Sequence, residues 1–343
     1  MDTKKGKTES RPAKKNLPAL SNLVSDYDFE LPDELIANRP LPDRDASRMM
    51  VLHRSTGTIE HRHFRDLPEY IQPGDLAVLN NSKVIKARLF STDGRIEMLL
   101  LEPLGGMRWK CLVKPGRKMR IGDSCSVAGT QAIVREIFPD GERALEFGDE
   151  PDLDRFGTMP IPPYFRRDAD AEDSVRYQTV FAETPGSVAA PTAGLHFTPE
   201  VLARIPHAFL TLHVGVGTFM PVKADRLEDH RMHEERYRIS AATARAITGA
   251  KRLLAVGTTS ARVLESQPPG AISPHSGSTD IFLHPPLTLQ RVDLLLTNFH
   301  LPKSTLLMLV SALAGRERIL SAYAEAIRER YRFFSYGDCM LIV

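Results

Sequence analysis

The feature that most constrains the fold of this chain is a series of short strand-like segments between residues 75 and 147. Turn pairs such as Asp93-Gly94, Pro115-Gly116 and Asp140-Gly141 separate the segments, and no helical periodicity interrupts them. Short strands at this spacing are typical of a small β-barrel. We therefore expect an inserted all-β barrel domain, and we place its limits at residues 73–153.

The sequence after this block alternates between strand-like and helical patterns. Residues 207–214 are strand-like, whereas residues 303–315 and 317–331 are helical. Such alternation is typical of an α/β sheet covered by helices, and 343 residues are too many for one ordinary core. The fold class we expect is α/β, in which a main layered α/β domain at 23–72 and 154–343 is interrupted by the barrel.

The composition limits the partners that we expect. Residues 1–22 contain six Lys or Arg residues and few apolar ones, so we predict a disordered basic tail there. The net charge is only +2, so a nucleic-acid site must be a local cluster of basic residues. There is no apolar run of membrane-helix length, no signal peptide and no CxxC motif among the cysteines. We expect a cytoplasmic protein that contacts no membrane.

Three polar loops follow directly after predicted strands, at residues 213–219, 256–262 and 297–305. In open α/β sheets, ligands bind in the crevice beyond the carboxyl ends of the strands. We therefore expect the three loops to meet at one edge of the sheet and to form a single pocket.

The loop at 256–262 combines a glycine with hydroxyl side chains. Gly257 permits close approach of the backbone to a ligand. Thr258, Thr259 and Ser260 place hydroxyl and free N–H groups at a helix start, where anions and polar ligands bind. Helix capping alone would use the same residue types, so this loop by itself leaves both interpretations open.

The loop at 297–305 is rich in polar residues between two apolar elements. Ser304 and Thr305 are typical helix caps, which leaves His300 and Lys303 without an obvious structural role. The loop at 213–219 has two glycines spaced as GxG and lacks the third glycine of a dinucleotide-binding motif.

Two further segments are candidates for ligand contact. Small residues around Thr192 would let a flat ligand approach the backbone, although close packing of a helix on the sheet explains the pattern equally well. His230 and His233 have the spacing of metal ligands on a helix, but no third soft ligand is near them. We therefore expect no metal site, and we interpret this segment as a solvated turn or a substrate contact.

Several long segments of the chain together resemble the sequence of one known protein family. They include RDASRMMVL, RYQTVFAETPGSVAAPTAGLHFTPE, LHVGVGTFMPV, EDHRMHEE, VGTTSARVLES and LLTNFHLPKSTLLMLVSALAGRE. From about Tyr27 to the C-terminus, the sequence resembles the S-adenosylmethionine:tRNA ribosyltransferase-isomerase family of queuosine biosynthesis. Matches of this length are far more specific than any short motif.

The resemblance implies a reaction and its substrates. The ribosyl part of S-adenosylmethionine would be transferred to 7-aminomethyl-7-deazaguanine at the tRNA wobble position and isomerised to an epoxycyclopentanediol. Adenine and methionine would leave, and epoxyqueuosine-tRNA would be the product. S-adenosylmethionine is then the ribosyl donor, no metal is required, and we expect a monomer that binds tRNA. The family fold, an α/β domain with an inserted β-barrel, agrees with the patterns described above.

This chemistry suggests roles for particular residues. A base must remove a proton beside the sulfonium, and an acid must assist the departure of adenine. We predict His213 and His300 for these two roles, because both lie on loops at strand ends, and Lys303 as a third catalytic residue.

The remaining candidates would bind substrates. The predicted substrate-binding residues are Gly215, Gly217, Thr218, Thr258, Thr259, Ser260, Asn298, Asp45, Arg48, Thr192, His196 and His233. Asp45 and Arg48 belong, with Asp43 and Arg44, to a charged cluster that would bind the nucleobase or the RNA, or would form a salt-bridged surface turn. Phosphate contacts are assigned to Lys83, Lys86, Arg88, Lys114, Arg117, Lys118 and Arg120.

Two alternatives from other functional classes remain open. A different S-adenosylmethionine-dependent RNA-modifying enzyme, such as a methyltransferase, usually has a glycine-rich turn early in its α/β domain, and none is clear here. A non-catalytic RNA-binding module built on the barrel would not need three polar loops at strand ends. The products of the reaction would distinguish these alternatives.

Overall fold

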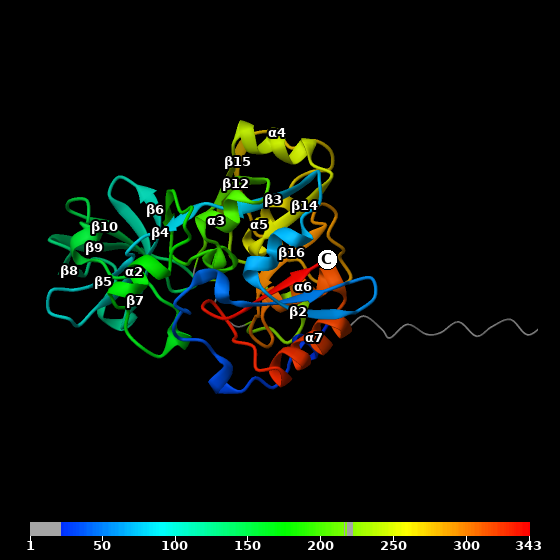
Figure 1. Ribbon diagram of the computed structural model, residues 1–343. Helices are drawn as coiled ribbons and strands as arrows, with labels where there is room; N and C mark the ends of the chain where they lie inside the picture. The colour runs from blue at the N-terminus through cyan, green and yellow to red at the C-terminus, as the bar shows by residue number, and fades with distance from the viewer. Residues whose placement is uncertain (1–21, 216, 218–221) are drawn as a thin grey trace, which may run out of the picture.

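The computed structural model of the chain describes residues 22–215, 217 and 222–343 (Figure 1). Two β-sheets organise this part of the chain, one of nine strands and one of six. The six-stranded sheet lies to one side of the nine-stranded sheet in Figure 1. The predicted combination of a mixed α/β fold with a small antiparallel barrel is therefore confirmed. The predicted basic tail falls almost wholly outside the described residues.

The nine-stranded sheet has a parallel centre. Its strands, in spatial order, are β15 (His275–Thr279), β13 (Glu235–Ile239), β12 (His207–Leu212), β3 (Asp75–Asn80), β14 (Arg252–Val256), β16 (Leu294–Asn298), β17 (Cys339–Ile342), β1 (Arg48–Leu52) and β2 (Ile59–His63). β12, β3, β14 and β16 pair in parallel, so their carboxyl ends lie at the same edge of the sheet. β1 and β2 form the expected antiparallel hairpin.

Both faces of this sheet are buried, and β14 shows the alternation. Leu253 and Ala255 belong to a core that includes residues of α5 (Gly257–Glu265), α6 (Thr305–Ala314) and α7 (Arg316–Arg328). Leu254 and Val256 point to the opposite face and pack in a core with residues of η4 (Phe64–Tyr70) and α3 (Pro199–Ala203). Successive side chains of a strand point to opposite faces, so one apolar strand contributes to both cores.

The six-stranded sheet is antiparallel and nearly closed. Its strands, in spatial order, are β5 (Arg88–Phe90), β6 (Glu97–Gly105), β7 (Arg108–Lys114), β10 (Arg143–Phe147), β9 (Thr130–Ile137) and β8 (Ser124–Val127). A bridge between Ser91 and Val127 joins the two edge strands, and the Thr92 N–H donates to the Ser126 carbonyl at 2.8 Å. The sheet encloses a core of its own, which includes Leu89 and Leu145.

One strand differs from its predicted place. β3 lies in the interval that we expected to belong to the barrel, yet it pairs with β12 and β14 in the centre of the nine-stranded sheet. All six of its residues are buried, as is usual for a central parallel strand. A short apolar run does not reveal which sheet it joins, because barrel strands and central parallel strands can look alike in sequence.

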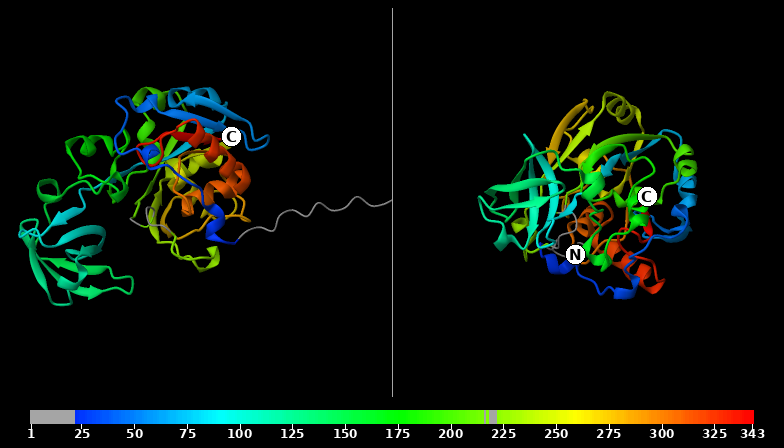
Figure 2. Two further views of the ribbon diagram at one scale, coloured as in Figure 1. Left: turned by 90° about the horizontal axis from the view of Figure 1, so that it is seen from below. Right: turned by 90° about the vertical axis from the view of Figure 1, so that its left-hand side faces the viewer.

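The connections place the two sheets relative to each other. β4 (Ser82–Val84) leads from the large sheet towards the barrel and pairs in parallel with β11 (Thr184–Ser187). The left view in Figure 2 shows the barrel standing apart from the body that contains the nine-stranded sheet. In the described part of the chain, every helix is too short or too polar to cross a lipid bilayer.

Further short helices complete the described chain. They are η1 (Val24–Tyr27), η2 (Asp33–Leu35), η3 (Arg44–Ala46), η5 (Gly116–Lys118), α1 (Leu153–Phe156), η6 (Pro163–Phe165), α2 (Ala171–Arg176), η7 (Thr192–His196), η9 (Leu227–Asp229) and α4 (Ala241–Gly249).

Candidate active site

A cavity of about 620 Å³, including its open mouth, lies beyond the carboxyl ends of β14 and β16, and we call it the main cavity. Residues from all three predicted loops line it, together with Thr192 of η7. The loop residues are Val214, Gly257, Thr258, Thr259, Thr297, Asn298, Phe299, His300, Leu301 and Ser304. The loops meet because β12, β14 and β16 run in the same direction within one sheet.

Helix α5 begins at the main cavity. Gly257, its first residue, has φ +86°, a backbone conformation that favours glycine. The preceding residue, Val256, makes no side-chain hydrogen bond to the helix start. Thr258 and Thr259 of the first turn are buried and line the cavity, whereas Ser260 is buried outside the lining. The helix therefore presents free N–H groups and hydroxyls to the cavity.

His300 is a buried, neutral imidazole in the cavity wall. Its Nε2 lies 2.9 Å from the Thr297 Oγ1, and its backbone N–H donates to the Tyr323 hydroxyl at 3.0 Å. Burial lowers the pKa of His300 to about 3. The ring is therefore uncharged at neutral pH.

Asn298 connects the cavity to the segment before β17. Its Nδ2 donates to the Phe334 carbonyl at 2.9 Å and more weakly to the Ser335 carbonyl at 3.4 Å. Because both acceptors are carbonyl oxygens, they fix which end of the amide is the donor. The side-chain oxygen must then face the other way.

Two aromatic rings form another part of the lining. The rings of Tyr164 and Phe334 stack with centroids 4.6 Å apart and planes inclined by 25°. Phe334 has φ +71°, which is strained for an aromatic residue, and such strain tends to occur at functional sites. The Tyr164 hydroxyl is hydrogen-bonded to the Ser335 hydroxyl. The two stacked rings therefore form a rigid apolar surface on which a flat ligand could stack.

A second cavity of about 270 Å³, including its open part, shares Ser335 with the main cavity. Asp43, Arg44, Ser47 and His196 are among the residues that line it. The His196 Nδ1 lies 3.0 Å from the Ser47 hydroxyl. Burial lowers the pKa of His196 to about 4, an effect that the Asn298 side chain opposes and that Arg44 reinforces. The predicted charged cluster at 43–48 thus reaches the site through Asp43 and Arg44.

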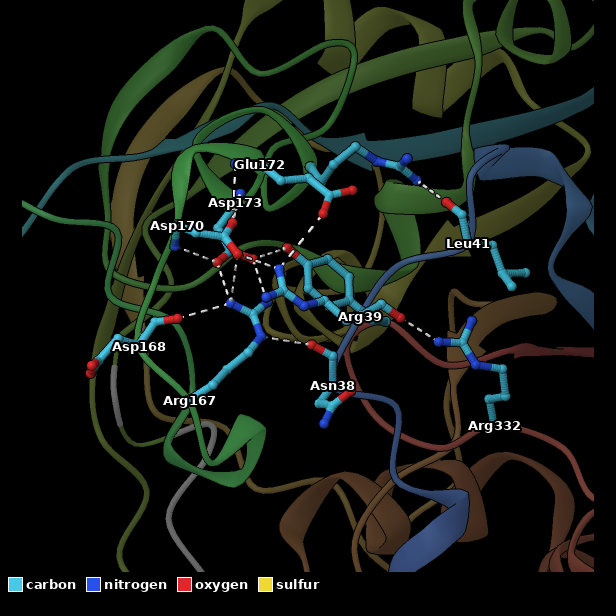
Figure 3. A network of polar contacts seen from close by, with 11 residues as sticks. Asn38, Arg39, Leu41, Arg167, Asp168, Asp170, Glu172, Asp173 and Arg332 are labelled. Carbon is cyan, nitrogen blue, oxygen red and sulfur yellow. Dashed lines mark hydrogen bonds and ion pairs between the residues drawn. The ribbon is translucent and has the colours of Figure 1, made fainter.

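A network of polar contacts braces the wall of the second cavity (Figure 3). Arg167 contacts both carboxylate oxygens of Asp173, at 2.6 and 2.7 Å, and the Tyr336 hydroxyl donates to the same carboxylate at 3.0 Å. Burial acts to raise the pKa of Asp173, but the Arg167 guanidinium and further hydrogen bonds hold it below its usual value. Arg332 donates to the Arg39 carbonyl. The network joins three segments that are distant in sequence.

Two predicted catalytic residues lie outside the main cavity. The half-buried ring of His213 packs against Gly186, where an added Cβ would lie 2.8 Å from its Nδ1. Burial, and then the charge of Arg236, lower the pKa of His213. Lys303 forms an ion pair with Asp28 at 2.7 Å, and both side chains are 46% exposed.

The predicted residues Asp45 and Arg48 contact other parts of the protein. The Asp45 carboxylate lies 3.5 Å from Arg65. The Arg48 guanidinium donates to the Glu329 carbonyl at 2.7 Å and lies 3.8 Å from the centre of the Tyr331 ring. Both side chains are thus held in structural contacts.

The loop after β12 contributes to a separate hollow. The Gly215 N–H donates to Glu235 at 3.1 Å. Gly217 packs closely against the His233 ring, and both line this hollow together with the buried ion pair of Arg262 and Glu235. Thr218 lies outside the described residues. Among the described residues, no group of three or more His, Cys, Asp or Glu residues could hold a metal ion.

The sequence interpretation missed Tyr164, Phe334 and Ser335. Each lies in a stretch of mixed aromatic and apolar residues, where nothing in the local pattern indicates a cavity-facing side chain. Only the fold brings the segment before β17 against the carboxyl end of β16.

Comparison with known proteins places this site in a family. The profile of the family described as "Queuosine biosynthesis protein" matches residues 24–342. Relatives named S-adenosylmethionine:tRNA ribosyltransferase-isomerase include one from Pelobacter propionicus, 51% identical, and one from Thermotoga petrophila, 49% identical, each covering 93% of this chain and 99% of its own. The crystal structure of S-adenosylmethionine tRNA ribosyltransferase from Thermotoga maritima matches with a TM-score of 0.54 and 42% identity, covering 93% of this chain and 100% of that chain. The chain therefore belongs to the queuosine biosynthesis protein family.

Proposed function

We propose that this chain is an S-adenosylmethionine:tRNA ribosyltransferase-isomerase, the activity for which its relatives are named. The donor is S-adenosylmethionine, and the acceptor is 7-aminomethyl-7-deazaguanine at the wobble position of tRNA. The products are epoxyqueuosine-tRNA, adenine and methionine. The observation that carries the proposal is the single cavity at which the three strand-end loops of this family member meet.

The main cavity suits a donor whose reactive centre is a sulfonium. Among the described residues that line it, none has a side chain that is charged at neutral pH. An uncharged surrounding leaves the sulfonium positive charge poorly screened, and this charge acidifies the hydrogens on the adjacent ribose carbon. The neutral imidazole of His300 is the base that we assign to that proton, since it lies in the wall whereas His213 and Lys303 do not.

The second cavity is our candidate for the acceptor base. It is adjacent to the main cavity at Ser335, and Asp43 offers a carboxylate to the donor groups of a guanine-like ring. Anticodon-loop bases are commonly splayed out and recognised on their edges. Two adjacent cavities would bring the aminomethyl group close to the ribose that it attacks.

The barrel supplies the RNA phosphate contacts in this proposal. Lys114, Arg117, Lys118 and Arg120 are exposed and follow one another at the end of β7 and through η5. None of the four has an ion-pair partner among the residues that the structure describes. Free cations of this kind bind phosphates by releasing counterions. We further propose a cytoplasmic monomer without a metal ion, in which the barrel is an insertion in a layered α/β domain.

The test is incubation of the full chain with S-adenosylmethionine and tRNA that contains 7-aminomethyl-7-deazaguanine, followed by nucleoside mass spectrometry. We expect epoxyqueuosine in the tRNA, with adenine and methionine released in equal amounts. S-adenosylhomocysteine as the product would overturn the proposal in favour of a methyltransferase. Binding of tRNA without any turnover would instead indicate an RNA-binding module.

A further inference from the structure

The N-terminus of α5 forms part of the lining of the main cavity. The first N–H groups of an α-helix have no partner within the helix, and the aligned peptide dipoles add a partial positive charge there. α5 has nine residues, and Val256 before it makes no side-chain hydrogen bond to it. Helices α4 and α6 are capped instead, by Ser240 and Ser304.

Thr259 gives an independent indication that a ligand binds here. Thr259 is only 6% exposed and lines the main cavity, yet its Oγ1 has no hydrogen-bond partner among the described residues. A buried hydroxyl without a partner destabilises the fold, so such groups are usually explained by a ligand or a function. The hydroxyl and the helix N–H groups lie on the same turn of α5.

The rest of the lining contains a second α-helix N-terminus, that of α6, whose N-cap Ser304 already accepts a hydrogen bond from the Leu307 N–H. Its described residues include no Lys or Arg side chain, and His300 is neutral. Gly257 adds no side chain between the helix start and the cavity, and an added Cβ would contact the Thr259 Oγ1 at 3.4 Å. Of the two α-helix starts in the lining, that of α5 has no side-chain cap, so it is the more favourable place for an anionic group.

We propose that the N-terminus of α5 binds the α-carboxylate of the donor's methionine part, with the Thr259 hydroxyl and the first N–H groups of the helix as donors. The inference rests on the proposed function and adds an orientation to it. With the carboxylate at α5, the ribose and sulfonium lie towards Asn298 and His300. The adenine ring then lies on the stacked rings of Tyr164 and Phe334.

The experiment compares two ligands on the wild-type full chain by calorimetry. The ligands are S-adenosylmethionine and its decarboxylated analogue, which keeps the sulfonium, ribose and adenine. We expect the analogue to bind at least about tenfold more weakly, because it lacks the charge-assisted hydrogen bonds. Equal binding of the two ligands would overturn the inference without any variant, whereas failure of both to bind would overturn the proposed function itself.

Variants assign the effect to Thr259. Thr259→Val, which removes the hydroxyl at nearly constant volume, should weaken S-adenosylmethionine binding about tenfold and leave the analogue within about twofold. Thr259→Ser keeps the hydroxyl and should restore tight binding. Thr248→Val is the matched control. Thr248 lies on α4, outside the main cavity, and its hydroxyl donates a hydrogen bond to the Ala244 carbonyl. Equal losses for both ligands in Thr259→Val would show that the hydroxyl binds the ribose instead.

Discussion

The Thr297 hydroxyl lies 2.9 Å from the His300 Nε2, so the end of β16 holds the imidazole that forms part of the main cavity wall. Since the Tyr323 hydroxyl also fixes the His300 backbone, the ring has little freedom to leave the cavity. If His300 is the base, as we propose, the position of this ring fixes where a proton is removed from a bound donor.

Replacement of His300 should therefore impair chemistry more than binding. We expect His300→Ala to lower the rate of adenine release by about 10²- to 10⁴-fold, the usual contribution of a general base. Affinity for S-adenosylmethionine should change much less, because the ring contributes only a small part of the contact surface. His213→Ala is the control, since that ring does not line the cavity. Wild-type turnover in folded His300→Ala would exclude this residue as the base.

Stability should fall on acidification below pH 6.5, in part because of His196. Burial lowers its pKa from 6.5 to about 4, so the unfolded chain binds a proton that the folded chain does not, and stability decreases as the pH falls. Between pH 7.5 and pH 5, this residue should contribute a loss of about 2 kcal/mol. Urea unfolding of the wild-type protein and of His196→Gln at both pH values measures this loss of unfolding free energy. The loss should be smaller in the variant; identical pH dependence would contradict the assignment.

The buried carboxylate of Asp173 should matter far more to stability than the exposed pair at Lys303. Asp173→Asn removes the buried carboxylate that contacts Arg167 at 2.6 Å and leaves Arg167 with the partly exposed Asp170 at 3.7 Å, so we expect a loss of about 3 kcal/mol. Lys303→Ala breaks an exposed pair and should cost about 1 kcal/mol or less. Denaturant unfolding compares the two. Equal effects would mean that the network in Figure 3 does not brace the site.

The barrel cations should control tRNA affinity and its salt dependence. Ala substitution of Arg117 or Lys118 should weaken tRNA binding and reduce the slope of log K against log salt by about 1 for each phosphate that is no longer neutralised. Arg245→Ala is a matched control, because that exposed residue lies on α4, away from the barrel in Figure 1. Filter binding at several salt concentrations gives both quantities. An unchanged slope in the barrel variants would place the RNA elsewhere.

The sequence allowed the meeting of the three loops to be predicted, because polar residues that follow parallel strands must lie at one edge. Thr258 and Asn298 were found in this way. The place of His213 was not found in this way: beyond the end of β12, Val214 lines the main cavity and His213 does not.

Other features depended on the tertiary fold. Phe334 enters the lining through a left-handed backbone conformation, which a phenylalanine gives no reason to expect. β3 has the same local character as a barrel strand, and only its pairing with β12 and β14 assigns it to the large sheet. Such long-range pairings cannot be inferred from a single short segment.

Ser335 lines both cavities, and its side chain is small. A bulky residue at this position would leave each compartment able to take its own molecule while keeping the two apart. In the proposed reaction, the donor and the acceptor base would then both be bound but held apart, so we expect the small side chain of Ser335 to be what lets the aminomethyl group reach the ribose.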